Sequence, residues 1–307
     1  MGSIVKRLLA LLLVVWMTGC GGSNETQSGD KLNIVTTTGM IADVVKNLGK
    51  DSVNVQALMG PGVDPHLYKA TQGDLGRLQA ADIIFYNGLH LEGKMGEVFE
   101  KLERIKNVIP VANRVAPSSL LADPVYQEAY DPHIWFDVSL WMTTVEVVLE
   151  ALIATDQENT GYYTENATLF RNQLGELDAW VRQQIATIPK EKRIMITAHD
   201  AFNYLGQAYD IEVRGLQGIS TLSEFGLKDR VDLVNFIVEK GIKAVFVETS
   251  VSEKNIKAIV EGCRQKGHEV VIGGNLFSDA MGAEGTPEGT YIGMVRSNVN
   301  TIVNSLK

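Results

Sequence analysis

The longest regular pattern in the chain is residues 159–187, NTGYYTENATLFRNQLGELDAWVRQQIAT. Its apolar or small side chains recur in steps of four and three residues, which defines one helix face, at Tyr163, Ala167, Phe170, Leu174, Leu177, Val181 and Ile185. At 1.5 Å per residue, a helix of this length would measure roughly 43 Å. Because that exceeds the diameter of a small domain, we expect this helix to join two lobes.

Short apolar runs alternate with helical patterns on both sides of this helix. They predict strands at residues 32–36, 53–58 and 83–86 before it, and at residues 193–197, 211–215, 244–248 and 270–272 after it. This alternation is typical of βαβ units. We therefore predict an α/β fold of two lobes with mostly parallel sheets, linked by one long rigid helix. A hydroxyl residue three positions before an acid predicts helix starts at Thr71 and Ser250.

The first twenty residues have the order of an export signal. Lys6 and Arg7 precede an apolar run that is too short to span a bilayer, and a small-residue end follows. Ending on Gly-Cys resembles a bacterial lipoprotein signal, in which Cys20 becomes the lipidated first residue. We predict a signal peptide 1–19, a flexible tether 20–30, an N-terminal lobe 31–158, a linking helix 159–187 and a C-terminal lobe 188–307.

Charge and cysteine content limit the class of protein. The chain has a net charge of −9, and because residues 1–19 hold two basic and no acidic residues, the mature part carries −11. An acidic, exported protein without a basic block argues against nucleic acid as a partner. With Cys20 lipidated, Cys263 has no partner for an internal disulfide, so stability must come from packing.

The tripeptide Asp-Pro-His occurs twice, in Asp64–Tyr68 and in Asp131–Trp135, and each copy is followed by an apolar and an aromatic residue. Proline fixes its own backbone and pushes the preceding residue toward an extended conformation, so each copy is a stiff turn. A histidine held on a stiff turn suits a metal ligand. One copy could be an ordinary surface loop, but two copies in a chain with five histidines indicate a shared site.

Four side chains, His66, His133, His199 and Asp279, follow predicted strands or precede helices. Ligands gather at this position in open α/β folds. Two of the four come from each half of the chain, so a site between the lobes would satisfy all of them. Three imidazoles and one carboxylate suit Zn²⁺, Mn²⁺ or Fe²⁺ and suit Ca²⁺ and Mg²⁺ poorly.

Other polar residues near these positions have alternative interpretations. His268 follows a glycine at a helix end and is expected to be structural or solvated, whereas His90 lies in a separate loop and could compete for the metal. Four acids could orient the imidazoles or could simply cap helices and loops: Asp64, Asp131, Asp200 and Glu248.

Several blocks of sequence carry a resemblance to a known family. Beside the two Asp-Pro-His copies they are NGLHLEGKM at 87–95, TAHDAF at 197–202, GLQGIST at 215–221, SDAMG at 278–282 and YIGM at 291–294. In this order they resemble the metal-binding lipoproteins (solute-binding proteins) of manganese and zinc ABC transporters, the TroA-like family. The resemblance covers essentially the whole mature chain and is greatest to the manganese-binding members.

The resemblance implies a function and a location. The metal would be held between the lobes by His66, His133, His199 and Asp279, and the protein would be a carrier rather than an enzyme. A monomer, anchored by its N-terminal lipid at the extracytoplasmic face of the cell membrane, would deliver the ion to an ABC permease and its ATPase.

The transported ion is expected to be Mn²⁺ or Zn²⁺, and we favour manganese. Zinc carriers of the family often have a histidine-rich acidic loop, and residues 116–130 contain no histidine. His199 stands where some manganese binders carry Glu, which makes the ligand set more attractive to Zn²⁺ by the Irving–Williams order. We therefore expect zinc to bind at least as tightly in vitro.

Three alternatives to a manganese carrier remain open from the sequence. The first is a zinc-specific binding protein of the same family. The second is an exported zinc metallohydrolase, with Glu248 or Glu224 as base, although Asp279 would fill the position that water needs and no His-Glu-x-x-His helix is present. The third is a surface adhesin with an incidental metal, for which no receptor-binding surface is encoded.

Overall fold

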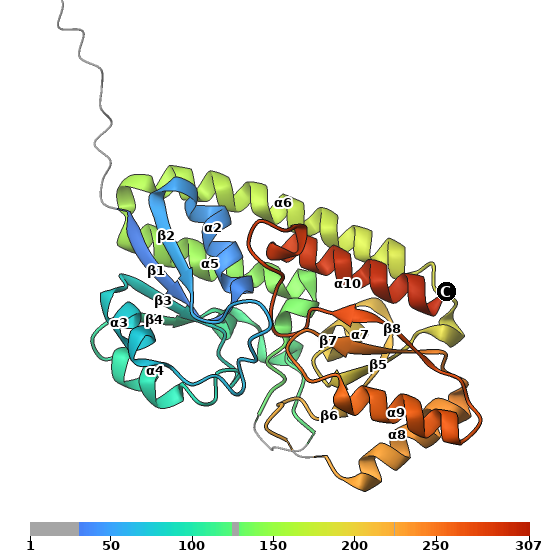
Figure 1. The fold of residues 1–307 in the computed structure, drawn as a ribbon. Coiled ribbons are helices and arrows are strands. Elements are labelled where there is room, and N and C mark those ends of the chain that lie inside the picture. Colours follow the sequence, from blue (N-terminus) through green and yellow to red (C-terminus); the bar gives the residue numbers. More distant parts are fainter. Residues whose placement is uncertain (1–30, 125–128, 224) are drawn as a thin grey trace, which may run out of the picture. The chain divides into compact units, whose positions relative to one another are not determined.

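Residues 31–124, 129–223 and 225–307 are described by the computed structural model of the protein. The predicted signal peptide, the tether and Cys20 lie outside the described residues. Residues Leu32–Lys307 form one compact unit, so the predicted lobe boundaries near residues 158 and 188 stay predictions. The α/β architecture of this unit is shown in Figure 1.

The first half of the chain contains a parallel sheet in the strand order β2-β1-β3-β4. Its strands are β1 (Leu32–Thr36), β2 (Val53–Ala57), β3 (Ile83–Tyr86) and β4 (Asn107–Pro110), and the helices between them are α2 (Gly39–Gly49), α3 (Gln72–Ala80) and α4 (Gly96–Leu102). Strand β3 is apolar and largely buried, as expected for the inside of a parallel sheet. The strand β4 and the helix α4 are short and were not predicted from the sequence.

The second half of the chain contains two parallel strand pairs, β5 with β6 and β7 with β8. Its strands are β5 (Ile194–His199), β6 (Glu212–Gln217), β7 (Ala244–Glu248) and β8 (Val271–Leu276), and the helices between them are α7 (Asn203–Tyr209), α8 (Leu227–Lys240) and α9 (Lys254–Gln265). Strands β5 and β7 lie next to each other, and the Glu248 carboxylate accepts the backbone N–H groups of Ala198 and His199 between them. The four predicted strands of this half are confirmed to within a few residues.

The long helix α6 (Thr160–Ile185) has 26 residues and so measures about 39 Å at 1.5 Å per residue. Its buried residues are the seven that define the predicted apolar face: Tyr163, Ala167, Phe170, Leu174, Leu177, Val181 and Ile185. The helix packs on α2 and α5 (Val138–Thr155) from the first half of the chain and on α10 (Tyr291–Leu306) from its end (Figure 1). It therefore shares one apolar core with elements of both halves.

The core of the described part of the chain contains one long apolar helix, two buried tryptophans and one buried cysteine. Among the described residues, α5 is long and apolar enough to cross a membrane by length and composition alone, but half of its residues are buried inside the structure. Trp135 and Trp141 are completely buried, and Cys263 is a buried free thiol. Short 3-10 turns connect the elements: η1 (Lys50–Ser52), η2 (Val111–Arg114), η3 (Pro117–Ser119), η4 (Ile134–Phe136), η5 (Gln157–Asn159), η6 (Lys190–Lys192) and η7 (Pro287–Gly289).

The two predicted helix caps have different outcomes. Thr71 caps α3 in a complete capping box with Asp74, as the spacing predicted. The cap predicted at Ser250 is wrong, because α9 begins only at Lys254 and has no side-chain cap. The hydroxyl of Ser250 instead lies 2.7 Å from that of Ser278, so a tertiary contact beside Asp279 replaces the local one.

Candidate metal centre

Two of the four predicted ligands lie at or just after the ends of β-strands, and the other two lie in loops. His199 is the last residue of β5, and Asp279 follows the end of β8 by three residues. His133 directly precedes the turn η4, and His66 lies in the loop after β2. All four side chains are buried, with at most 2% of the residue exposed, although imidazoles and carboxylates are rarely buried without partners.

The structure brings these four side chains together. The Nε2 atoms of His66 and His133 are 3.3 Å apart, the Nε2 atom of His133 is 3.3 Å from Oδ1 of Asp279, and the Nε2 atom of His199 is 3.2 Å from Oδ2 of Asp279. One potential ligand atom from each residue lies within 4.8 Å of the others. His199 Nε2 and Asp279 Oδ1 are buried without a hydrogen-bond partner, which suits a site whose partner is a cation.

Two of the four predicted orienting acids contact an imidazole ring. Asp131 Oδ1 is 2.7 Å from Nδ1 of His133, and Glu248 Oε2 is 2.5 Å from Nδ1 of His199. A carboxylate on Nδ1 favours the tautomer that leaves Nε2 free to bind a metal. Both imidazoles are therefore oriented with Nε2 toward the centre of the cluster.

The other two acids hold backbone rather than imidazole. Asp64 accepts the backbone N–H of His66 at 2.8 Å, and Asp200 accepts the backbone N–H of Gly215 at 2.5 Å. Each thus fixes a loop next to a predicted ligand. The two copies of the Asp-Pro-His motif share this backbone contact, because Asp131 also accepts the backbone N–H of its own histidine, at 2.9 Å.

Burial and charge shift the ionisation of these groups in different directions. Burial lowers the pKa of His66 to about 3. For His133, burial opposes the charged form, but the charges and hydrogen bonds of Asp131 and Asp279 raise the pKa to about 9. Burial opposes the charged form of His199, but the Glu248 and Asp279 carboxylates raise its pKa well above the usual range. Burial likewise opposes the charged form of Asp279, but His199 and His133 lower its pKa well below the usual range. A cation entering the site would replace protons as the partner of these carboxylates.

The remaining candidates lie outside the cluster. The Nε2 atom of His268 is 2.6 Å from the carbonyl oxygen of Ile242, so this histidine has a structural contact, as predicted. Glu224, one of the two candidate bases of a hydrolase, lies outside the described residues. The other, Glu248, already accepts three hydrogen bonds, which leaves it poorly suited to take a proton from water.

A cavity of about 370 Å³ reaches the cluster on the side of His66 and is also lined by the exposed His90. His90 and its neighbour Leu89 both have left-handed backbone conformations, with φ of 63° and 53°. Such conformations are uncommon for residues other than glycine and are found at functional sites more often than elsewhere. No sequence pattern had indicated this strain.

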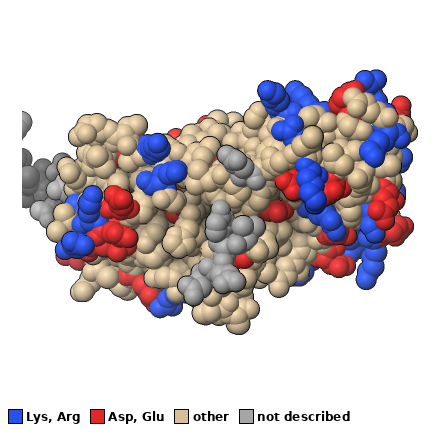
Figure 2. All heavy atoms as spheres, turned by 90° about the horizontal axis from the view of Figure 1, so that it is seen from below, with Lys and Arg blue, Asp and Glu red and all other residues tan. Residues whose placement is uncertain are grey.

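One face of the molecule carries few basic side chains in its middle (Figure 2). The face in Figure 2 has its visible lysine and arginine side chains gathered toward the two ends, with few of them in the band between. Together with the net charge of −9, this distribution favours the approach of a cation.

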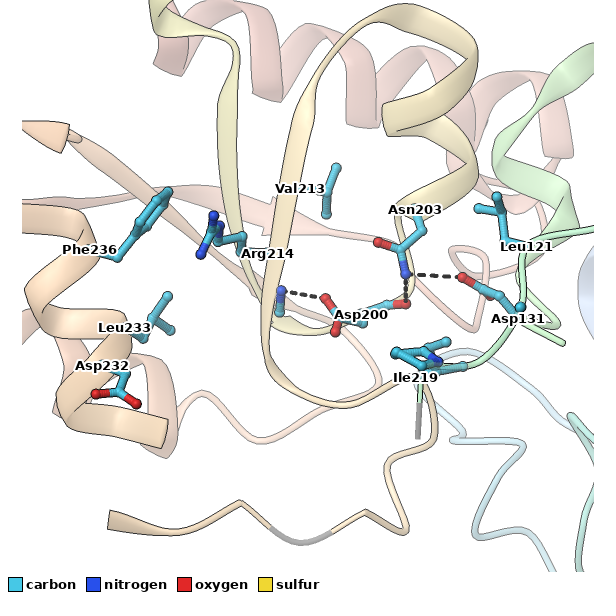
Figure 3. Close-up of a pocket in the computed structure, with 13 residues that line it drawn as sticks. Leu121, Asp131, Asp200, Asn203, Val213, Arg214, Ile219, Asp232, Leu233 and Phe236 are labelled. Carbon is cyan, nitrogen blue, oxygen red and sulfur yellow. Dashed lines mark hydrogen bonds between the residues drawn. The ribbon is translucent and has the colours of Figure 1, made fainter. Parts of the chain in front are cut away.

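A larger cavity, of about 820 Å³ (Figure 3), is lined by Asp131 and Asp200 but by none of the four candidate ligands.

Two aromatic residues, Trp135 and Tyr291, make hydrogen bonds beside the candidate ligands His133 and Asp279. The indole N–H of Trp135 donates to the carbonyl oxygen of Ser278 at 3.0 Å, and the Tyr291 hydroxyl donates to the carbonyl oxygen of Trp135 at 2.7 Å. Because Trp135 is two residues from His133 and Ser278 is next to Asp279, the Trp135–Ser278 bond helps to fix these two candidate ligands relative to each other.

Comparison with known proteins identifies the family. Residues 34–305 match the family model described as zinc-uptake complex component A, periplasmic. The chain belongs to this family. It is 48% identical over 292 residues to the manganese-binding lipoprotein MntA of Bacillus subtilis, covering 95% of each chain. It is 46% identical over 299 residues to the zinc-binding protein TroA of Treponema pallidum, covering 97% of this chain and 96% of TroA.

The fold is shared with solved structures of the family. The structure of the periplasmic zinc-binding protein TroA from Treponema pallidum matches with a TM-score of 0.88, covering 90% of this chain and 99% of that one. The predicted fold and family are thereby confirmed. Members of this zinc-uptake family are substrate-binding proteins rather than enzymes, and the chain is the extracytoplasmic metal-binding component of an ABC metal-uptake system.

Proposed function

We propose that the protein captures one divalent transition-metal ion, with manganese as its physiological cargo, between His66, His133, His199 and Asp279. The observation that carries this proposal is the convergence of four buried ligand atoms within 4.8 Å of one another. The orientation of two imidazoles by Asp131 and Glu248 supports it further, because such hydrogen bonds are the usual support of metal-binding histidines.

The choice between manganese and zinc is argued from the donor set. The relatives named for manganese and for zinc are almost equally similar to this chain, so their names do not decide. Both oxygens of Asp279 face the imidazoles, which offers up to three nitrogen and two oxygen donors. Zn²⁺ sites are mostly four-coordinate, whereas carboxylate oxygens and more than four ligands suit Mn²⁺. Three imidazoles nevertheless make zinc a strong competitor.

The last step of the proposed function is delivery of the metal ion to an ABC transporter. A monomer tethered through lipid on Cys20 would hold the loaded site at the outer face of the membrane, within reach of the permease of an ABC transporter. What supports this is the order of the first twenty residues and the family to which the chain belongs. Transfer then requires the permease to disturb the loops that carry the ligands.

Three measurements test the proposed function. Protein purified without chelator should contain about one metal ion per chain, and competition titration against a chromophoric chelator should rank Zn²⁺ at or above Mn²⁺ in affinity. A strain lacking the protein should grow poorly under manganese starvation, and growth should be restored by the wild-type chain but not by a His133→Ala variant. Protein that retains no metal, or a strain rescued equally by both chains, would refute the proposal.

A further inference from the structure

The carboxylates of the two Asp-Pro-His motifs share two contacts, and Asp131 in addition contacts the ring of its own histidine. In each, Oδ1 accepts the backbone N–H of the motif's own histidine, at 2.8 Å for Asp64 and 2.9 Å for Asp131. In each, Oδ2 points to the other half of the chain. Oδ2 of Asp64 accepts the hydroxyl of Thr221 at 2.6 Å, and Oδ2 of Asp131 accepts the side-chain amide of Asn203 at 3.1 Å.

The two partner residues, Asn203 and Thr221, lie in different kinds of structure, a helix and a loop. Asn203 is the first residue of α7, and its amide also donates to the carbonyl oxygen of Asp200 at 3.1 Å (Figure 3). The next residue, Tyr204, donates its hydroxyl to the carbonyl oxygen of Asp131 at 2.9 Å. Thr221 lies instead in the loop between β6 and α8, and its carbonyl oxygen accepts the side-chain amide of Gln217. One contact is thus held by a helix and the other by a loop.

These contacts couple the docking of the lobes to the position of the ligands. Asp131 is fully buried and Asp64 is half-buried, so a carboxylate oxygen that loses its donor is left in a poorly solvated place. While the C-terminal lobe is docked, both oxygens of each carboxylate are engaged and the following histidine is fixed. If the two halves moved apart, Asp64 would lose the Thr221 hydroxyl, and Asp131 would lose the Asn203 amide and the Tyr204 hydroxyl, while each Oδ1 atom would keep the N–H of its own histidine.

We infer that Thr221 and Asn203 are positioning residues which, through Asp64 and Asp131, hold the two N-terminal imidazoles in place and thereby slow the release of the metal. This inference rests on the proposed function, since it assigns a role in the same site. Neither residue touches the cluster itself. We expect their effect on the dissociation rate, because these contacts join the two halves of the chain next to the cluster in the arrangement that the structure describes.

The experiment measures association and dissociation of Zn²⁺ separately on the purified full-length protein. Trp135, whose ring centroid is 5.2 Å from that of His133, offers a fluorescence signal for association. Capture of Zn²⁺ by an excess of chromophoric chelator gives the release rate. Thr221→Val should release Zn²⁺ roughly tenfold faster with an unchanged association rate, the lower end of the effect expected from residues that support metal ligands. Thr221→Ser should restore slow release, and Asn203→Ala should also accelerate it.

A matched control separates this role from general loosening of the lobes. Lys46 and Glu284 form an exposed ion pair of 2.6 Å between α2 and the segment before η7, away from the cluster. Lys46→Gln should therefore leave release unchanged. Release at the wild-type rate from Thr221→Val, or equal acceleration by Lys46→Gln, would overturn the inference. If wild-type protein binds no metal, the proposed function itself fails; if it binds one ion and only the rates disagree, the positioning role alone fails.

Discussion

Glu248 offers a substitution whose consequence follows from hydrogen-bond chemistry. Its Oε1 accepts two backbone N–H groups, from Ala198 at 2.7 Å and His199 at 3.0 Å, and its Oε2 accepts Nδ1 of His199. In the Glu248→Gln variant, the N–H groups of Ala198 and His199 still need an acceptor, so the single amide oxygen takes the place of Oε1. The amide nitrogen then faces Nδ1 of His199, which can accept its hydrogen only after giving up its own proton.

The proton of His199 would then reside on Nε2, the atom that faces Asp279 and the proposed metal position. Loss of a hydrogen-bonded partner of a metal-binding histidine typically costs 10- to 100-fold in affinity, or about 1.4 to 2.8 kcal/mol at 1.4 kcal/mol per tenfold. We expect the Glu248→Gln variant to bind metal at least roughly tenfold more weakly than wild type. Competition titration with a chromophoric chelator at neutral pH measures this difference directly.

Glu92 provides a matched control for loss of a buried carboxylate. It is 3% exposed, and its carboxylate likewise accepts backbone N–H groups, from Asn87 and Gly88, together with the hydroxyl of Thr37. None of these contacts involves an imidazole. Glu92→Gln should therefore leave metal affinity close to that of wild type. Equal weakening by both substitutions, or an unchanged affinity for Glu248→Gln, would refute the tautomer argument.

His133→Ala should abolish stoichiometric metal binding in equilibrium dialysis, whereas His268→Ala should retain it, because only the first lies in the cluster. Burial raises the pKa of Asp43 from 3.8 to about 6, so its carboxyl binds a proton more tightly in the folded state, and stability is lost as the pH rises through that range. Asp43→Asn keeps an acceptor for the Tyr291 N–H and should raise the free energy of unfolding at pH 8 by up to about 3 kcal/mol, with no gain below pH 4, as measured by urea unfolding. Thr71→Ala removes the cap of α3 and should cost about 1 kcal/mol of unfolding free energy in the same assay while metal affinity stays unchanged.

Sequence patterns predicted the parts of this molecule that are governed by local periodicity or by a stiff local motif. The apolar face of α6 was predicted residue by residue, because a repeat over seven turns leaves little ambiguity. The candidate ligands were found because Asp-Pro-His is repeated and because His199 and Asp279 follow strands. The four side chains do converge, and their role as metal ligands stays a prediction.

What the sequence did not predict depends on contacts between distant segments. Strand β4 has only four residues, too few for a periodic signal. The spacing at Ser250 is that of a cap, but a contact with Ser278 takes its hydroxyl. Thr221 and Asn203 carry no motif of their own, since their importance comes from the second oxygens of Asp64 and Asp131 across the two lobes.

The central claim is that one metal ion binds the Nε2 atoms of His66, His133 and His199 together with the carboxylate of Asp279. Anomalous diffraction from crystals of the Mn²⁺-loaded and the Zn²⁺-loaded protein, each recorded at its own metal edge, tests it most directly. We predict one strong peak per chain within about 2.0–2.3 Å of these four side chains. A peak at another position, or loaded protein whose four side chains remain without a peak between them, would contradict the account.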